Sequence, residues 1–195
     1  MAGNSETYDR DKAGGGAIVP EGELYALIRD CLKESRLAQK KLYDTFSPKA
    51  FGIIRRYIYD DEAAAEEVLN DSFYKVLTRL DQYSFQGSFE GWIRRIVINT
   101  ITDHLRKSIS AVQLKEVKTE DAHVQSEPIG NIAHKELLLL VQSLPAAQRT
   151  VFNLFVAENY AHKEIAAMIG ITESNSRWYL NDARRRLREK IKFHQ

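Results

Sequence analysis

Large apolar side chains recur every three or four residues along most of this chain, and this spacing limits the architectures open to it. From Glu23 to Leu105, and again from Ile132 onward, the apolar positions fall on one side of a helix. No segment alternates strictly between apolar and polar residues within hairpin turn signals, as a half-exposed strand would. The sequence therefore predicts an all-α fold.

Two stretches without sustained periodicity divide the chain. Residues 1–22 are polar and glycine-rich, which predicts a flexible N-terminal tail. Residues 108–131 mix charged and small polar residues with a proline and a glycine, a composition typical of a flexible linker. We therefore predict two small helical domains, residues 23–107 and residues 132–195.

Inside the first predicted domain, the dipeptide Ser47-Pro48 is interpreted as a helix start. Ser47 would be the N-cap and Pro48 would occupy the first turn, where a missing amide hydrogen costs nothing. One helix is therefore expected to end near Phe46 and another to begin there. Residues 62–80 are expected to form a long amphipathic helix, and a polar break at residues 82–88 separates it from the next one.

Composition gives no support to an enzyme or an exported protein. Cys31 is the single cysteine, so no internal disulfide can form, and the five histidines show no metal-ligand spacing. The three consecutive glycines near the N-terminus lack the Lys-Ser/Thr of a phosphate-binding loop. No apolar run is long enough for a membrane helix or a signal core. We predict a cytoplasmic protein with no catalytic residue, no metal and no cofactor.

The segment from His162 to Arg177 has the layout of a helix-turn-helix. Gly170 occupies the position where a tight turn between helices needs a left-handed backbone, and Thr172 would cap the second helix. The small side chain of Ala166 would let the two helices approach closely. The core beneath the turn is expected to contain Ile165, Ile169, Ile171 and Leu180.

The second helix of this motif would carry hydrogen-bond donors along one side, suited to base edges in the major groove. The candidates are Ser174, Asn175, Arg177, Trp178 and Asn181. Its later turns, which include Arg184 and Arg185, have a local cationic excess suited to phosphates. Two alternatives to DNA binding stay open. A run of charged residues more often marks a solvated helix face. The helix pair could also bind protein instead of DNA.

Three stretches together resemble the signatures of the extracytoplasmic-function (ECF) sigma factors of the sigma-70 family. They are residues 61–73, which begin Asp-Glu-Ala-Ala-Ala-Glu, residues 89–99, Phe-Glu-Gly-Trp-Ile-Arg-Arg-Ile-Val-Ile-Asn, and residues 160–187. The resemblance covers about residues 23–195. It implies a sigma-2-like first domain that binds core RNA polymerase and the promoter's minus-ten element. It also implies a sigma-4-like second domain whose helix-turn-helix binds the minus-thirty-five element.

The first stretch resembles the family's polymerase-binding helix, and its charge agrees with that role. Its acidic residues have no Lys or Arg between them and would suit a basic coiled-coil partner. They are Asp61, Glu62, Glu66, Glu67 and Asp71. The alternative is that acids in a first helical turn favour the helix dipole, which accounts for Asp61 and Glu62 but less well for Glu67 and Asp71.

The second stretch resembles the helix that meets the melted minus-ten strand. Arg94, Arg95 and Arg106 are candidates for phosphate contacts, and Asn99 is the candidate for reading an extruded base. Trp92 is a stacking platform in one interpretation and a core residue in the other, which we favour because it lies in an apolar stripe.

The loop at residues 82–88 corresponds to one that shapes a base pocket in the family, so Phe85 and Gln86 are further candidate contacts. Two positions depart from the family's pattern. Ser176 is polar where an aliphatic residue is often buried, and Asp182 is acidic where relatives often carry a base. These departures put the promoter sequence, more than the fold, in doubt.

The resemblance implies an alternative sigma factor, which directs transcription initiation and has no chemistry of its own. Its partners would be core RNA polymerase, promoter DNA and an anti-sigma factor. A conventional helix-turn-helix regulator with an N-terminal sensor or dimerisation domain is the first alternative. A helical enzyme is the second, and the sequence supports it poorly.

Overall fold

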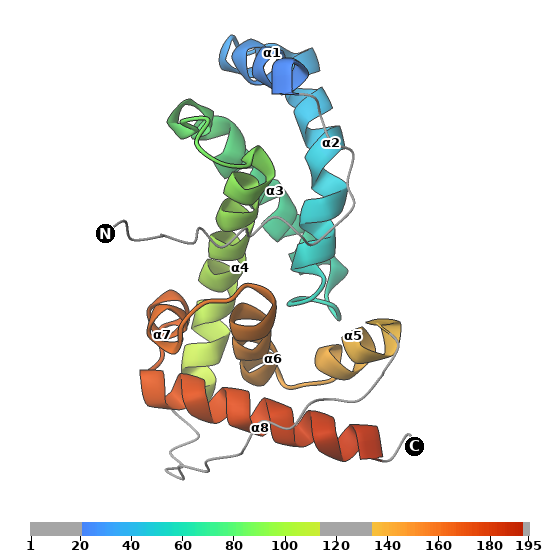
Figure 1. Ribbon diagram of the computed structural model, residues 1–195, viewed down its shortest axis with the longest axis vertical. Coiled ribbons are helices and arrows are strands. Elements are labelled where there is room, and N and C mark those ends of the chain that lie inside the picture. Colours follow the sequence, from blue (N-terminus) through green and yellow to red (C-terminus); the bar gives the residue numbers. More distant parts are fainter. Residues whose placement is uncertain (1–20, 114–133, 193–195) are drawn as a thin grey trace, which may run out of the picture. The chain divides into compact units, whose positions relative to one another are not determined.

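The computed structural model describes residues 21–113 and 134–192 (Figure 1). Within these ranges the chain is helical and contains no strand, which confirms the all-α prediction. The elements are α1 (Glu21–Leu32), α2 (Arg36–Ile54), α3 (Glu62–Thr78), η1 (Leu80–Gln82), α4 (Phe89–Gln113), α5 (His134–Gln142), α6 (Ala146–Phe152), η2 (Asn153–Ala157), α7 (His162–Ile169) and α8 (Glu173–Lys192).

The chain divides into two compact units, residues 1–45 and residues 46–195. In the smaller unit, α1 buries Leu27, Ile28 and Cys31. The larger unit contains two groups of helices, here called the first module (residues 46–113) and the second module (residues 134–192). Nearly all of the predicted tail, and the predicted linker from residue 114 onward, lie outside the described residues.

The prediction of a helix boundary at Ser47-Pro48 is wrong, because α2 runs without a break from Arg36 to Ile54 with Pro48 inside it. A proline in a helix interior costs about 3 kcal/mol. The apolar stripe of α2 stays in phase through the proline, from Leu42 and Phe46 to Ile54, and all three side chains are buried. Each such burial contributes about 1.5–3 kcal/mol, so continuing the helix is favourable.

Helix α3 begins where the sequence predicts. The carboxylate of Asp61 accepts a hydrogen bond of 2.9 Å from the amide of Ala64 and caps the helix. Its apolar side, which includes Ala65, Leu69 and Phe73, is buried and packs against α4. The acidic side of α3 is consequently turned away from the core.

An aromatic cluster anchors the start of α4. The ring of Phe89 lies 5.3 Å from that of Phe46, 4.9 Å from that of Tyr83 and 5.7 Å from that of Trp92, between centroids. The Tyr83 hydroxyl also donates a hydrogen bond of 2.7 Å to the carbonyl of Gly87. Helix α4 then continues to Gln113, six residues past the predicted end at residue 107, because its apolar stripe extends to the buried Ile109.

In the second module, α5, α6 and α7 all pack on α8 (Figure 1). Helix α6 runs into the π-helical turn η2, where the amide of Glu158 donates a hydrogen bond of 3.0 Å to the carbonyl of Asn153, five residues back. Among the described residues, no helix is long and apolar enough to cross a membrane.

The helix-turn-helix prediction is confirmed in its backbone geometry. Gly170 follows α7 with φ 71° and ψ 39°, the left-handed conformation that ends the helix. The hydroxyl of Thr172 accepts a hydrogen bond of 3.1 Å from the amide of Asn175, so Thr172 caps α8. Ile165 and Ile169 of α7 and Leu180 of α8 are buried together below this turn.

Replacing Gly170 with alanine should lower the free energy of unfolding by about 1–2 kcal/mol, because a Cβ disfavours the left-handed backbone. Urea unfolding followed by circular dichroism measures the change. Gly91 is the matched control: it lies inside α4, and a Cβ there would meet Ser88 at an ordinary 3.8 Å. Gly91→Ala should therefore raise stability by about 0.5–1 kcal/mol. Equal responses of the two positions would contradict the role assigned to Gly170.

Candidate nucleic-acid interface

The seven residues predicted to contact the minus-thirty-five element lie on α8. Ser174, Arg177 and Arg185 are exposed, and the other four are partly exposed. Arg177 forms an ion pair with Glu173, and Arg185 forms ion pairs with Asp182 and Glu189 on the same helix. Exposed pairs within one helix contribute little stability. These guanidinium groups can therefore exchange their partners for an external anion at small cost.

The two positions that depart from the family pattern are buried and hydrogen-bonded inside the second module. Ser176 is fully buried, and its hydroxyl shares a hydrogen bond of 2.9 Å with Nδ1 of His162 on α7. The side chain of Asp182 is 7% exposed and accepts hydrogen bonds of 3.0 Å from Gln148 and 2.6 Å from Arg186. Both residues therefore join helices of the module, and the polarity that looked irregular in the sequence stabilises its packing.

The two titratable groups at these positions, Asp182 and the His162 partner of Ser176, both have lowered pKa values, for different reasons. Burial by itself raises the pKa of Asp182, but hydrogen bonds from Arg186, Arg185 and Gln148 outweigh it and lower that pKa below its ordinary value. Burial lowers the pKa of His162, and the positive charges of Arg177 and Arg184 lower it further, against the opposing effect of Glu173. His162 also stacks on Phe155, with ring centroids 4.6 Å apart.

The five acidic residues predicted to bind polymerase are all exposed on α3. None of them forms an ion pair with another of the described residues, and Asp61 has the additional role of capping the helix. Sequence reasoning missed Tyr74, whose side chain is 70% exposed one turn beyond Asp71. The signal was available, because Tyr74 falls on the polar face, out of phase with the apolar stripe of α3.

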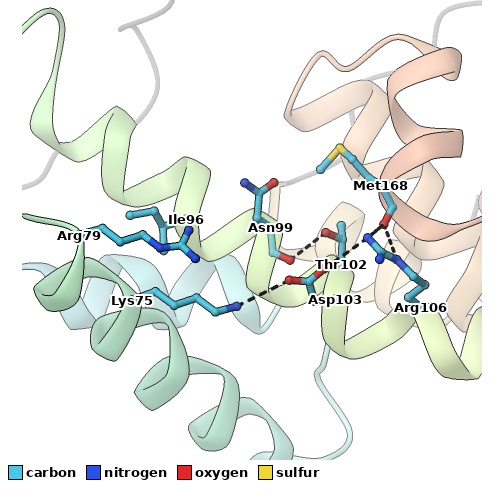
Figure 2. Close-up of a pocket in the computed structure, with 8 residues that line it drawn as sticks. All are labelled: Lys75, Arg79, Ile96, Asn99, Thr102, Asp103, Arg106 and Met168. Carbon is cyan, nitrogen blue, oxygen red and sulfur yellow. Dashed lines mark hydrogen bonds and ion pairs between the residues drawn. The ribbon is translucent and has the colours of Figure 1, made fainter. Parts of the chain in front are cut away.

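Helix α4 places Asn99 and Arg106 at a polar pocket of about 280 Å³ that is lined by the end of α3, by α4 and by Met168 of α7 (Figure 2). The pocket is lined by Lys75, Arg79, Ile96, Asn99, Thr102, Asp103, Arg106 and Met168. The Lys75 ammonium donates a hydrogen bond of 3.2 Å to the Thr100 hydroxyl and lies 3.6 Å from the Asp103 carboxylate. The three cations of the pocket, Lys75, Arg79 and Arg106, suit a phosphate, and the amide of Asn99 suits a base edge.

Sequence reasoning missed Lys75 and Arg79 at this pocket. Lys75 lies in the last turn of α3 and Arg79 is the residue that caps its C-terminus, and the sequence interpretation treated this helix only as a polymerase-binding helix. Basic residues spaced by four on a predicted helix were the available signal, but only the packing of α3 against α4 brings them to Asn99. Arg94 and Arg95 do not line the pocket, and Arg95 is exposed elsewhere on α4.

The aromatic residues near the predicted base pocket form a partly exposed group. Trp92 is half-buried and its ring stacks on that of Phe89, with an interplanar angle of 15°. Phe85 is exposed, adopts a positive φ of 56° and lies 4.9 Å from the ring of Tyr83. Gln86 is exposed in the same loop. The packing of Trp92 on Phe89 agrees with the favoured core interpretation while leaving part of the indole accessible.

Two of the four residues predicted to bind the minus-ten strand contact the second module. The Arg94 guanidinium donates two hydrogen bonds to the Glu158 carboxylate, of 2.6 and 2.9 Å. The Arg106 guanidinium donates two to the carbonyl of Met168, of 3.0 and 2.7 Å (Figure 2). Local sequence patterns cannot reveal these contacts, because each pair is separated by more than sixty residues.

The described residues hold no group of three or more His, Cys, Asp or Glu side chains placed to bind a metal ion. The candidate residues lie instead on three charged helix faces. The face of α3 is acidic and that of α4 is basic, both in the first module, and the face of α8 in the second module is basic.

Comparison with known proteins identifies the class to which this arrangement belongs. Residues 42–109 match the family model for Sigma-70 region 2, and residues 134–187 match that for Sigma-70, region 4. The chain belongs to the sigma-70 family, in its extracytoplasmic-function subfamily, as the sequence resemblance indicated.

Relatives with this description are distant in sequence. The ECF RNA polymerase sigma factor BldN of Streptomyces coelicolor is 26% identical over 142 residues, which cover 68% of this chain and 52% of that protein. The RNA polymerase sigma-E factor of Streptomyces avermitilis is 28% identical over 139 residues, covering 70% and 75%. The chain spans about half the length of several curated relatives that it matches, 52% in two cases.

One similar solved structure is the sigma factor RpoE in complex with the anti-sigma factor NepR from Bartonella quintana. It is 20% identical, covers 80% of this chain and 98% of that chain, and has a TM-score of 0.46.

The stability of the protein should depend on His162 between pH 7.5 and 5. Because the folded-state pKa of His162 lies below its unfolded value of about 6.5, its contribution is fully present above that pH. The contribution is lost as the pH falls from the unfolded pKa toward the folded one. Urea unfolding at pH 7.5 and at pH 5 should therefore show that the free energy of unfolding falls more for the wild type than for His162→Gln.

His104→Gln provides the control for this experiment, because His104 is exposed on α4. That variant should lose as much stability on acidification as the wild type. Asp182 stays ionised over the same range, since its pKa is lowered from an already acidic value. Identical pH dependence of His162→Gln and the wild type would contradict the assignment.

Proposed function

We propose that this chain is an alternative sigma factor, which binds core RNA polymerase and directs it to specific promoters. The observation that carries the proposal is the match to sigma-70 region 2 followed by sigma-70 region 4, in one chain and in that order. A conventional regulator would need its helix-turn-helix but not the first of these matches. The protein acts as an adaptor in the cytoplasm and leaves catalysis to the polymerase.

The acidic face of α3 is the proposed docking surface for polymerase. Its exposed carboxylates have no cationic partner among the described residues, so a basic surface of the polymerase can pair with them without first breaking an ion pair. We add Tyr74 to this surface, because an exposed tyrosine beside charged residues is a frequent energetic centre of protein interfaces.

The polar pocket beside α4 is the proposed site for the melted minus-ten strand. Lys75, Arg79 and Arg106 would hold phosphates, and Asn99 would read an extruded base through its amide. Arg94 and Arg95 would extend the phosphate contacts along the strand.

Helix α8 is proposed to enter the major groove at the minus-thirty-five element. Ser174, Asn175, Arg177, Trp178 and Asn181 would face the bases, and Arg184 and Arg185 would face phosphates. The two DNA sites belong to one chain, so binding of one raises the effective concentration of the other. An anti-sigma factor that covers either site is the expected regulator.

The proposal is tested by adding the full chain to sigma-free core polymerase and transcribing genomic fragments. Promoter-directed transcripts with defined start sites are expected, and a conventional regulator would give none. The double variant Glu66→Lys, Glu67→Lys should lower core affinity by at least about tenfold, because it places two positive charges against a basic partner.

The control exchanges the same charges away from α3, at the exposed Glu23 and Glu136. That variant should bind core polymerase as the wild type does. Equal core affinity of the α3 variant and this control would remove α3 as the docking surface. Absence of any complex between wild-type chain and core polymerase would refute the function itself.

Arg177→Ala should weaken binding to the selected minus-thirty-five duplex by about 1–3 kcal/mol, if Arg177 contacts guanine through two hydrogen bonds. The loss should be confined to sequences that carry that guanine. Fluorescence anisotropy with the selected duplex and single-base variants measures it. Equal weakening on all sequences would reassign Arg177 to a phosphate contact.

A further inference from the structure

Three consecutive arginines of α8, at positions 184–186, differ in what holds their side chains. The guanidinium carbon of Arg184 lies 5.8 Å from the centroid of the Phe155 ring, and Arg184 forms no ion pair with another of the described residues. Arg185 and Arg186 both donate to the carboxylate of Asp182, one turn earlier on the same helix. The run of positive charge therefore contains two kinds of cation.

Asp182 differs from the other two acids of α8 because its side chain is turned into the second module. That side chain is 7% exposed, whereas those of Glu173 and Glu189 are 44% and 55% exposed. Gln148 of α6 donates a further hydrogen bond, of 3.0 Å, to Oδ2 of Asp182. Burial raises the pKa of this carboxyl, but its three hydrogen-bond donors lower it further, so the group is a buried anion. A buried anion is stable only while its donors stay in place.

Arg186 is the arginine better placed to remain on Asp182. It donates through Nε, the guanidinium nitrogen nearest the backbone, over 2.6 Å to the same Oδ2 that Gln148 binds. Its side chain is 42% exposed, against 54% for Arg185. Arg185 instead binds Asp182 through a terminal nitrogen, and it has a second acid, Glu189, at 3.0 Å. Arg185 can therefore leave Asp182 for another anion, provided that Arg186 stays.

We propose that Asp182 is a positioning residue that withholds Arg186 from the DNA backbone and uses it, together with Gln148, to anchor α8 on α6. Arg184 and Arg185 remain the phosphate contacts of this part of the helix. The inference rests on the proposed function, because it concerns how α8 meets duplex DNA. Transfer of Arg186 to a phosphate would leave the buried carboxylate without its inner cation, and this loss offsets the gain of one phosphate contact.

A withheld cation affects how strongly α8 binds DNA and not which bases it reads. Phosphate contacts carry no sequence information, so one contact fewer weakens binding to every duplex by the same factor. The base contacts proposed for the earlier turns of α8 are unchanged. Asp182, an acid where the family often has a base, thus lowers sequence-independent affinity while it fixes the later turns of the helix.

The salt dependence of binding tests the two kinds of arginine, because each neutralised phosphate releases condensed counterions. Binding of the full chain to a fluorescein-labelled, mixed-sequence duplex is measured by anisotropy between about 50 and 200 mM salt. Arg184→Gln should make the slope of log affinity against log salt shallower by about 0.9, the value for one phosphate. Arg186→Gln removes the same charge two residues further along and should leave the slope unchanged.

Asp182→Asn removes the charge that holds Arg186 and keeps an oxygen that can accept from Gln148. The slope should become steeper by about 0.9, and affinity at low salt should rise about five- to tenfold. Adding Arg186→Gln to this variant should restore the wild-type slope. Glu136→Gln, the same charge change at an exposed position of α5, should leave the slope unchanged. A merely structural role of Asp182 would lower affinity without a steeper slope, and urea unfolding shows that each variant is folded.

A measurement that needs no DNA separates this proposal from the proposed function. By nuclear magnetic resonance of isotope-labelled, full-length protein, the Arg186 Nε–H should be protected from solvent exchange and the Arg184 Nε–H should not. The protection should be lost in Asp182→Asn and kept when duplex is added to the wild type. Equal exchange at the two arginines, or equal slopes for Arg184→Gln and Arg186→Gln, overturns this proposal alone. Failure of the wild type to bind any duplex at low salt overturns it together with the proposed role of α8.

Discussion

Every functional face of this protein depends on the burial of an apolar stripe on the opposite side of the same helix. In α3 the stripe through Ala65, Leu69 and Phe73 packs on α4, and the acidic face points outward as a result. In α8 the buried Leu180 and Leu187 pack the helix on α6 and α7. Because burial of each large side chain is worth about 1.5–3 kcal/mol, it outweighs the small energies of surface charge pairs and fixes where they point.

The same constraint explains why polar residues inside the second module are tolerated. Ser176 and Asp182 are buried where a typical helix-turn-helix is apolar or exposed, and each has its hydrogen bonds satisfied by a neighbouring helix. A buried polar group without a partner would cost several kcal/mol. With partners, such groups fix the position of α8 on α7 and α6, and thereby the orientation of the proposed base-reading face.

Guanidinium groups are used in two distinct ways across the chain. Arg177 and Arg185 on α8 pair with acids of their own helix, which solvent and DNA phosphates can replace at little cost. Arg94 and Arg149 are bound by groups from distant parts of the chain in half-buried or buried surroundings. The first kind suits rapid exchange with a ligand, and the second kind holds helices together.

The sequence by itself determined the helical class, the end of α7 at Gly170, the start of α3 and the residues on each charged face, because these depend on interactions between near neighbours. It did not determine the unbroken path of α2 through Pro48, since a local penalty was outweighed by burial along the whole stripe. Nor did it place Lys75 beside Asn99 or Glu158 on Arg94. Only the tertiary structure decided those contacts, because they join residues far apart in the chain and depend on how the helices pack.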